Sequence, residues 1–397
     1  MHNPQDKKYT SLQILRALAA WTVVYHHYMQ LYFGFESDAN IGSFFSKYGN
    51  LGVDIFFVLS GFVMYFASRN TEKSARAFII DRVFRIAPVY WFYTLVIILC
   101  IFLMPKEFGY TDYNFKTLIA SLFFLPHLNQ SGLGYYPILT VGWTLNFEMF
   151  FYASLALCMG LTRKYFFPLL FLAFVFLPLL YPRHVIYSNV ASSFMLYEFL
   201  AGLVLAALIT SKAGDFVAKK FPRSILLTGA VAVTSSTIIL VLYHEKFPFA
   251  VSTVFLALVA ERFIDHRSAW TKILARLGDE SYSTYLAHVV VIGIAMNLTG
   301  KNLSQTEQLL TVFSITLGIW VVSKISYRCI ERSRYLDALR QGLIMRIGLH
   351  TKSASITAET DTGFRAVSDG NSLPLIKPAQ VEVEDIGTEA TSFNSRN

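Results

Sequence analysis

The sequence predicts an all-α, polytopic membrane protein with about ten transmembrane helices and both termini in the cytoplasm. Of its 397 residues, 54% are hydrophobic and only 15% are charged, which is more apolar than a typical soluble domain. Uncharged runs such as 88–104 and 166–180 approach the roughly 20 residues that a helix needs to cross a bilayer. Short clusters of Lys and Arg separate the apolar runs, as is typical of cytoplasmic loops.

Ten apolar stretches are long enough to be drawn as spans. They lie at about residues 11–32, 51–67, 88–104, 141–161, 166–180, 192–210, 224–242, 249–264, 281–298 and 307–327. The apolar segment 118–126 is too short to span, so we expect it to be re-entrant or interfacial.

The distribution of positive charge predicts the orientation. With the N-terminus inside, the inner loops carry 17 Lys and Arg residues and the outer loops carry six. This excess fits cytoplasmic termini. The same scatter over loops argues against a nucleic-acid partner, despite the net charge of +8. The three cysteines lie far apart, so we expect neither a disulfide framework nor a metal site.

The chain is expected to have two parts. Residues 1–345 form the membrane domain, and residues 346–397 form a disordered cytoplasmic tail, because that segment is polar and has no sustained apolar period. We find no internal repeat, which counts against a transporter built from duplicated halves.

The first span contains ionisable residues, which cost at least about 2.5–3.5 kcal/mol at mid-membrane and are therefore functional candidates. Arg16 and His27 are eleven residues apart, a rotation within about 20° of three full turns and a rise of roughly 16 Å. They share a helix face, whereas His26 falls about 80° away and is expected to look elsewhere. The alternative is a snorkelling Arg16 and a histidine bonded to a backbone carbonyl.

Three buried acids are further candidates. Asp54, near the outer end of the second span, is expected at a depth similar to that of His27. Its carboxylate could fix the tautomer of the His27 ring, or it could instead cap the N-terminus of its own helix. Glu148 in the fourth span must be protonated, paired or facing a water-filled cavity, the alternative being a structural network with an arginine. Glu198, in the sixth predicted span, is a weaker candidate for a functional role.

Two further pairs are each spaced three residues apart and so share a helix face. Arg82 and Arg85 end the loop before Pro88, where the third span is expected to begin. Two guanidinium groups there suit a phosphorylated ligand, although ordinary anchoring is the alternative. Tyr285 and His288 could line a cavity, or could serve only in hydrogen bonds between helices.

Five motifs occur in order between about residues 11 and 340: LRALAAWTVVYHH, GVDIFFVLSGFV, DRVFRIAPVYW, WTLNFEMFFY and SYSTYLAH. Together they resemble the membrane-bound acyltransferase family 3, and within it the exopolysaccharide O-acetyltransferases of the ExoZ type. The resemblance implies a fold of ten or eleven spans that uses acyl-CoA, commonly acetyl-CoA, to acylate hydroxyls of envelope glycans.

The resemblance also carries residue roles. The first-span Arg and His of the family match Arg16 and His27, its paired arginines match Arg82 and Arg85, and its Trp-x-Leu-x-x-Glu pattern matches Trp143, Leu145 and Glu148.

The sequence departs from the family pattern at two places. Met149 stands where the family often has a second acid beside the fourth-span Glu, so a carboxylate pair is not available there. Glu331 is followed by Arg332 and Ser333, where the family usually has a nearby Pro, which leaves the role of that segment open.

These observations predict an integral O-acyltransferase of the bacterial inner membrane. It would move an acyl group from acyl-CoA to a polysaccharide or lipid-linked oligosaccharide, with acetyl favoured and succinyl an alternative. His27 is the expected base, oriented by Asp54 or Glu148. Arg82 and Arg85 are expected to hold CoA phosphates, and Arg16 to guide the pantetheine arm or neutralise a phosphate.

We also expect Trp143, Tyr285 and His288 to contact substrate, no metal to take part, and the polysaccharide-synthesis machinery to be a candidate partner. A transporter or flippase of glycan or lipid-linked sugar is the alternative, because it would also use intramembrane Arg, His and Glu. A glycan-binding accessory membrane protein is a third option.

Overall fold

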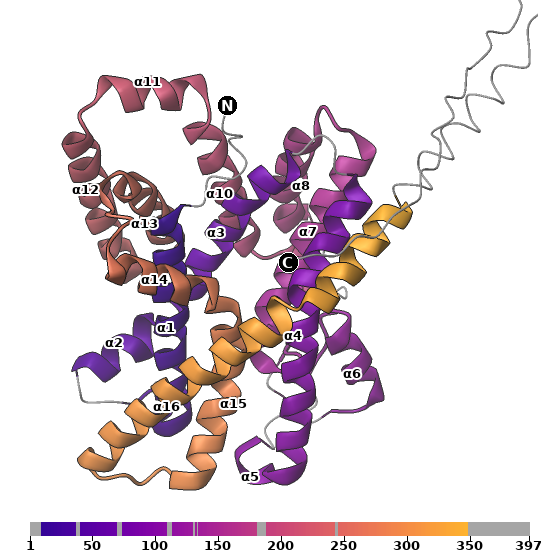
Figure 1. The fold of residues 1–397 in the computed structure, drawn as a ribbon, viewed down its shortest axis with the longest axis vertical. Helices are drawn as coiled ribbons and strands as arrows, with labels where there is room; N and C mark the ends of the chain where they lie inside the picture. The colour runs from indigo at the N-terminus through magenta and orange to yellow at the C-terminus, as the bar shows by residue number, and fades with distance from the viewer. Residues whose placement is uncertain are drawn as a thin grey trace, which may run out of the picture. The chain divides into compact units, whose positions relative to one another are not determined.

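The computed structural model describes residues 9–36, 40–69, 74–108, 113–129, 132, 134–180, 188–242 and 245–347. Every regular element in these ranges is helical, which confirms the all-α prediction (Figure 1). The chain divides into two units, Met1–Gly348 and Leu349–Asn397. The predicted tail lies outside the described residues from residue 348 onward.

The helices follow one another along the first unit. They are α1 (Thr10–Phe33), α2 (Asn40–Tyr48), α3 (Leu51–Ser68), α4 (Ala75–Leu103), α5 (Pro105–Phe108), α6 (Phe115–Leu122), α7 (Trp143–Leu161), α8 (Phe166–Leu180), α9 (Ser188–Ala191), α10 (Met195–Ile209), α11 (Lys212–Lys220), α12 (Arg223–Leu242), α13 (Phe247–Ala260), α14 (Ala269–Asp279), α15 (Ser281–Thr299) and α16 (Gln305–Ser326). Short 3₁₀ turns lie at Thr140–Gly142 and Glu261–Phe263. The π-helical turn η4 (Tyr327–Glu331) follows α16, and residues 334–347 are again helical.

Each of the ten predicted spans falls on a helix. Among the described residues, six helices are long and apolar enough to cross a membrane, or seven if α10 and α11, bent by 65°, form one broken span. The protein is therefore a multi-pass membrane protein. The count of ten and the side of each terminus remain predictions.

One predicted boundary is wrong. The third span was expected to begin at Pro88, with Arg82 and Arg85 in a loop, but α4 already begins at Ala75 and continues through Pro88. The side chain of Ser74 accepts a hydrogen bond from the backbone N–H of Ala77 at 3.1 Å, which caps the helix at this earlier point. Membrane helices tolerate an internal proline because neighbouring groups satisfy the freed backbone.

Helices α3 and α10 approach each other closely through a reciprocal pair of glycines. A Cβ atom on Gly61 of α3 would collide with the carbonyl oxygen of Phe199, and one on Gly202 of α10 would collide with that of Val58. Small residues permit such backbone contact between membrane helices.

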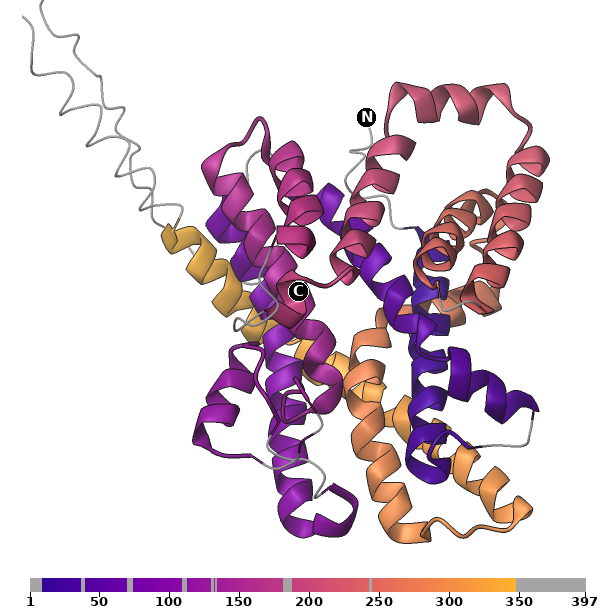
Figure 2. The ribbon, with the colours of Figure 1, turned by 180° about the vertical axis from the view of Figure 1, so that it is seen from behind.

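Helix α1 packs against α3, α14 and α15 (Figures 1 and 2). A residue far along the sequence caps its N-terminus. The Glu261 carboxylate accepts hydrogen bonds from the backbone N–H groups of Thr10 at 3.2 Å and Ser11 at 2.6 Å. Gly278 of α14 lies against the backbone of Gln13 and has no room for a side chain. These contacts set the position of the helix that carries Arg16 and His27.

Candidate active site

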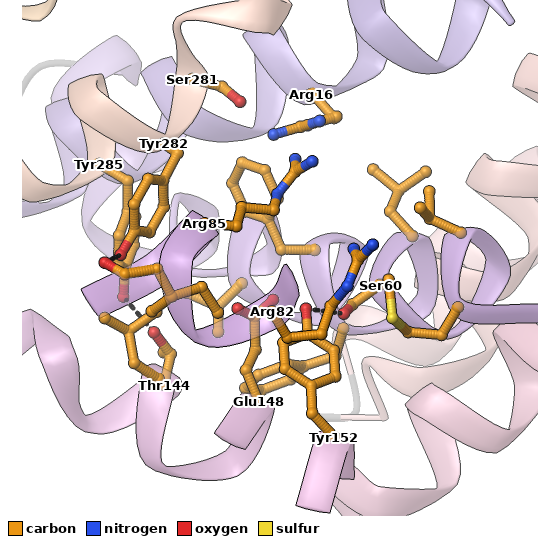
Figure 3. A pocket seen from close by; sticks show the side chains of 18 residues that line it. Arg16, Ser60, Arg82, Arg85, Thr144, Glu148, Tyr152, Ser281, Tyr282 and Tyr285 are labelled. Carbon is orange, nitrogen blue, oxygen red and sulfur yellow. Dashed lines mark hydrogen bonds between the residues drawn. The ribbon is translucent and has the colours of Figure 1, made fainter. Parts of the chain in front are cut away.

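Side chains from five helices meet in a cavity of about 100 Å³, which we call the arginine cavity (Figure 3). Its polar lining comes from Arg16 of α1, Ser60 of α3, Arg82 and Arg85 of α4, Thr144, Glu148 and Tyr152 of α7, and Ser281, Tyr282 and Tyr285 of α15. The structure thus brings together residues that sequence analysis singled out on four separate helices. Arg85 is exposed, whereas Arg16 and Arg82 are half-buried.

Glu148 supplies negative charge to this cavity. It interacts electrostatically with Arg85, Arg16 and Arg82, and its carboxylate accepts a hydrogen bond from Ser60. The Ser60 hydroxyl also lies 3.1 Å from the hydroxyl of Tyr152. The sequence offered two alternatives for Glu148, a place in a cavity wall or a network with an arginine. The structure shows both at once, because Glu148 lines the cavity and interacts with its arginines.

Arg82 has one donor atom that an anionic ligand could use. Its guanidinium carbon lies 5.6 Å from the centroid of the Phe78 ring. Its Nε is buried and has no hydrogen-bond partner among the described residues. A buried donor without a partner is costly, and a phosphate oxygen would relieve that cost.

A second cavity, of about 500 Å³, lies around His27, and we call it the histidine cavity. The Nδ1 atom of His27 lies 3.0 Å from the carbonyl oxygen of Val23 and 3.2 Å from Nε2 of His288. Because a carbonyl oxygen can only accept, Nδ1 carries the proton in the neutral ring and Nε2 keeps a lone pair. This tautomer leaves Nε2 as the basic atom.

His26 makes its own bond away from His27. Its Nδ1 lies 2.9 Å from the carbonyl oxygen of Phe45 in α2, which fits the alternative of a histidine bonded to the backbone. The expectation that it looks elsewhere is only partly right, because its ring also borders the histidine cavity. The centroids of the His26 and His27 rings are 5.5 Å apart.

The two cavities share two lining residues, Val53 of α3 and Tyr285 of α15. The Tyr285 hydroxyl lies 3.0 Å from the Thr144 hydroxyl (Figure 3). It also donates to the carbonyl oxygen of Val141 at 2.9 Å. Tyr285 is therefore fixed where the cavities adjoin. Arg16 lines one of these cavities and His27 lines the other.

Asp54 has a different partner from the one predicted. Its side chain is hydrogen-bonded to that of Glu198, a bond between two carboxyl groups of α3 and α10. The orienting contact at His27 comes instead from His288, which sequence analysis had placed only as a cavity-lining or interhelical residue. The helix register could not reveal this pair, because the two histidines are 261 residues apart.

Glu331 belongs to the surroundings of the arginine cavity, a role that sequence analysis left open. Its carboxylate accepts a hydrogen bond from the Ser283 hydroxyl and interacts electrostatically with Arg85 and Arg16. The side chain reaches this place from the π-helical turn η4. In the sequence, the only indication of this role was that Glu331 matches a Glu of the family pattern. The Pro that usually follows that Glu is missing here, which made the match uncertain.

The donor chemistry of the site suits an anion rather than a metal. Three guanidinium groups line the arginine cavity. No group of three or more His, Cys, Asp or Glu side chains within the described ranges could hold a metal ion.

Comparisons with known proteins agree with this architecture. The family model described as an acyltransferase domain, that of acyltransferase family 3, matches residues 9–325. The exopolysaccharide production protein ExoZ of Rhizobium meliloti (strain 1021) is 31% identical over 326 residues, which cover 75% of this chain and 92% of that protein. No solved structure matches the chain. The match over most of the chain shows that the protein belongs to the membrane-bound acyltransferase family 3.

Proposed function

We propose that this protein is an inner-membrane O-acyltransferase that moves an acyl group, with acetyl favoured, from acyl-CoA to a hydroxyl of an exported polysaccharide. The observation that carries the proposal is the shared wall between the arginine cavity and the histidine cavity at Val53 and Tyr285. A site for an anionic donor thereby adjoins a site that contains a base. The name of the ExoZ relative supports a role in exopolysaccharide production.

The arginine cavity would hold the donor. Arg85 is exposed and Arg82 has an unpartnered donor atom, which supports the proposal that these two residues would bind CoA phosphates. The enclosed volume of about 100 Å³ suits a narrow chain rather than a nucleotide. The pantetheine arm would therefore pass Arg16 toward Tyr285, with the thioester at its far end.

His27 would supply the base. Its Nε2 takes the proton from the acceptor hydroxyl while the oxygen attacks the thioester carbonyl, and the C–S bond then breaks. The same nitrogen returns the proton to the departing CoA thiolate, so that acylated glycan and free CoA result. A general base of this kind contributes about 10²–10⁴-fold in rate. His288 and the carbonyl of Val23 hold the ring in the required tautomer.

A direct test is to incubate the purified protein in lipid nanodiscs with radiolabelled acetyl-CoA and chemically de-O-acylated exopolysaccharide. Wild-type protein should label the polysaccharide, and His27→Gln should reduce the rate at least about 100-fold. His127→Gln is the matched control, because that histidine lines neither cavity and contacts the carbonyl of Leu125. Full activity of His27→Gln would refute the base assignment. Glycan transport without acylation would favour the transporter alternative.

A further inference from the structure

A third cavity adjoins the histidine cavity and belongs to neither the donor site nor the base. It encloses about 340 Å³, and its lining includes Tyr135, Tyr136, Trp143, Asn146 and Asn189. We call it the amide cavity. It shares Tyr136 and Trp143 with the histidine cavity, so a ligand could extend from one into the other.

The side-chain oxygens of two asparagines in this cavity have no hydrogen-bond partner among the described residues. Asn146 of α7 is only 4% exposed, yet its Oδ1 has no partner within the described part of the chain. The Oδ1 of Asn189 in α9 is buried and unpartnered in the same way. Since buried polar groups are nearly always paired, both amides indicate a ligand that offers hydroxyl donors.

The rest of the lining is uncharged, and four of its seven residues are aromatic. No Asp, Glu, Lys or Arg is among the described residues that line the amide cavity, in contrast to the three arginines of the donor cavity. The Trp143 ring is held edge-on against Phe147, with centroids 5.7 Å apart and planes at 88°. Aromatic rings pack against the apolar C–H faces of sugars, while amides bond their hydroxyls.

We propose that the amide cavity is a second acceptor subsite, which binds the sugar residue adjacent to the one that is acylated. The acceptor is then a neutral stretch of oligosaccharide or polysaccharide at least two residues long. A nucleotide sugar is disfavoured, because the cavity presents no cation for its phosphates. This inference rests on the proposed function, since it assigns a second site for the same acceptor.

The test measures how transfer depends on acceptor length. Exopolysaccharide from the producing strain is de-O-acylated, partially hydrolysed and fractionated into monosaccharides, disaccharides and tetrasaccharides. These fractions are offered with radiolabelled acetyl-CoA to the wild-type protein, Asn146→Ala, Asn189→Ala and the control Asn297→Ala. Asn297 is an exposed amide of α15 that lines none of the three cavities.

The wild-type kcat/KM should be at least about 10-fold higher for the tetrasaccharide than for the monosaccharide. Asn146→Ala and Asn189→Ala should each bring that ratio toward one, while Asn297→Ala keeps it. Thermal unfolding separates binding from folding, because removal of a buried amide oxygen that has no partner should not lower the Tm of Asn146→Ala.

Two outcomes overturn the subsite while leaving the proposed function intact. One is an equal wild-type kcat/KM for all lengths, and the other is a length preference that both cavity variants retain. Failure to acylate any fraction would overturn the proposed function itself, and the subsite with it.

Discussion

Single side chains decide how His27 is presented. Its Nδ1 is shared between a backbone carbonyl and His288, so a neutral neighbour takes the orienting position that an acid fills in a Ser-His-Asp triad. A neutral partner avoids a second buried charge in the membrane. Asp54, the predicted partner, is engaged with Glu198.

His288 is therefore expected to act as a positioning residue for His27. His288→Ala should lower kcat about 10- to 100-fold and leave the KM for acetyl-CoA nearly unchanged, because the arginine cavity is untouched. His288→Gln should recover part of the loss, since its amide can accept from Nδ1. Steady-state kinetics on both substrates check this. A rise in KM for acetyl-CoA with constant kcat would contradict the assignment.

The unpartnered Nε of Arg82 leads to a prediction about donor affinity. Arg82→Ala should weaken acetyl-CoA binding about 10- to 100-fold, because a charge-assisted hydrogen bond is lost, and Arg82→Lys should be intermediate. Isothermal titration calorimetry with acetyl-CoA measures this directly. Arg76, exposed in the first turn of α4, is the matched control. Equal affinity of Arg82→Ala and Arg76→Ala would make Arg82 an anchor only.

Among the elements, helices were predicted more successfully than their ends. Each of the ten apolar runs lies on a helix of the structure, because a segment buried in lipid must form a long apolar helix. The start of α4 was missed because its first turns carry charge and no apolar run marks them, although Ser74 caps them. Register within α1 was predictable, since rotation per residue is constant. Contacts between helices were not, because they depend on tertiary packing.

The glycine crossing of α3 and α10 gives a stability test. Gly202→Ala should destabilise the protein by about 1–3 kcal/mol or more, because the new methyl group would force the two backbones apart. Gly229→Ala in α12 is the control, since its Cβ would meet nothing within 4 Å. Thermal unfolding in detergent should show a lower Tm for the first variant only. Identical Tm values would mean that the crossing can relax without cost.

At the scale of the first unit, three cavities adjoin in sequence, from arginines to histidines to amides. The arginines, the glutamate and the histidines of the first two cavities were singled out from the sequence, because ionisable groups are rare within spans. The amide cavity was not, since Asn146 and Asn189 carry no charge and stand in no recognised pattern. Their significance is visible only once folding has buried them without partners.

A bulky side chain at Val53, which lines both the arginine cavity and the histidine cavity, should affect acyl transfer without affecting acetyl-CoA binding. Val53→Trp should leave acetyl-CoA affinity within about threefold of wild type and lower the transfer rate about 100-fold, because the acyl group would be kept from His27. Val53→Leu, a smaller change, should retain transfer. Calorimetry and the radiolabel assay measure the two quantities. Unimpaired transfer in Val53→Trp would show that the acyl group takes another route.

The capped and tightly packed α1 has one further consequence. Arg16 and His27 lie on a single uninterrupted helix from Thr10 to Phe33, so the roughly 16 Å between them is a fixed length. On the proposed mechanism, the helix would set the distance that the donor's pantetheine arm must span. A thioester on a shortened carrier such as N-acetylcysteamine would stop short of the base, whereas changes at the adenine end of CoA would leave the measured length intact.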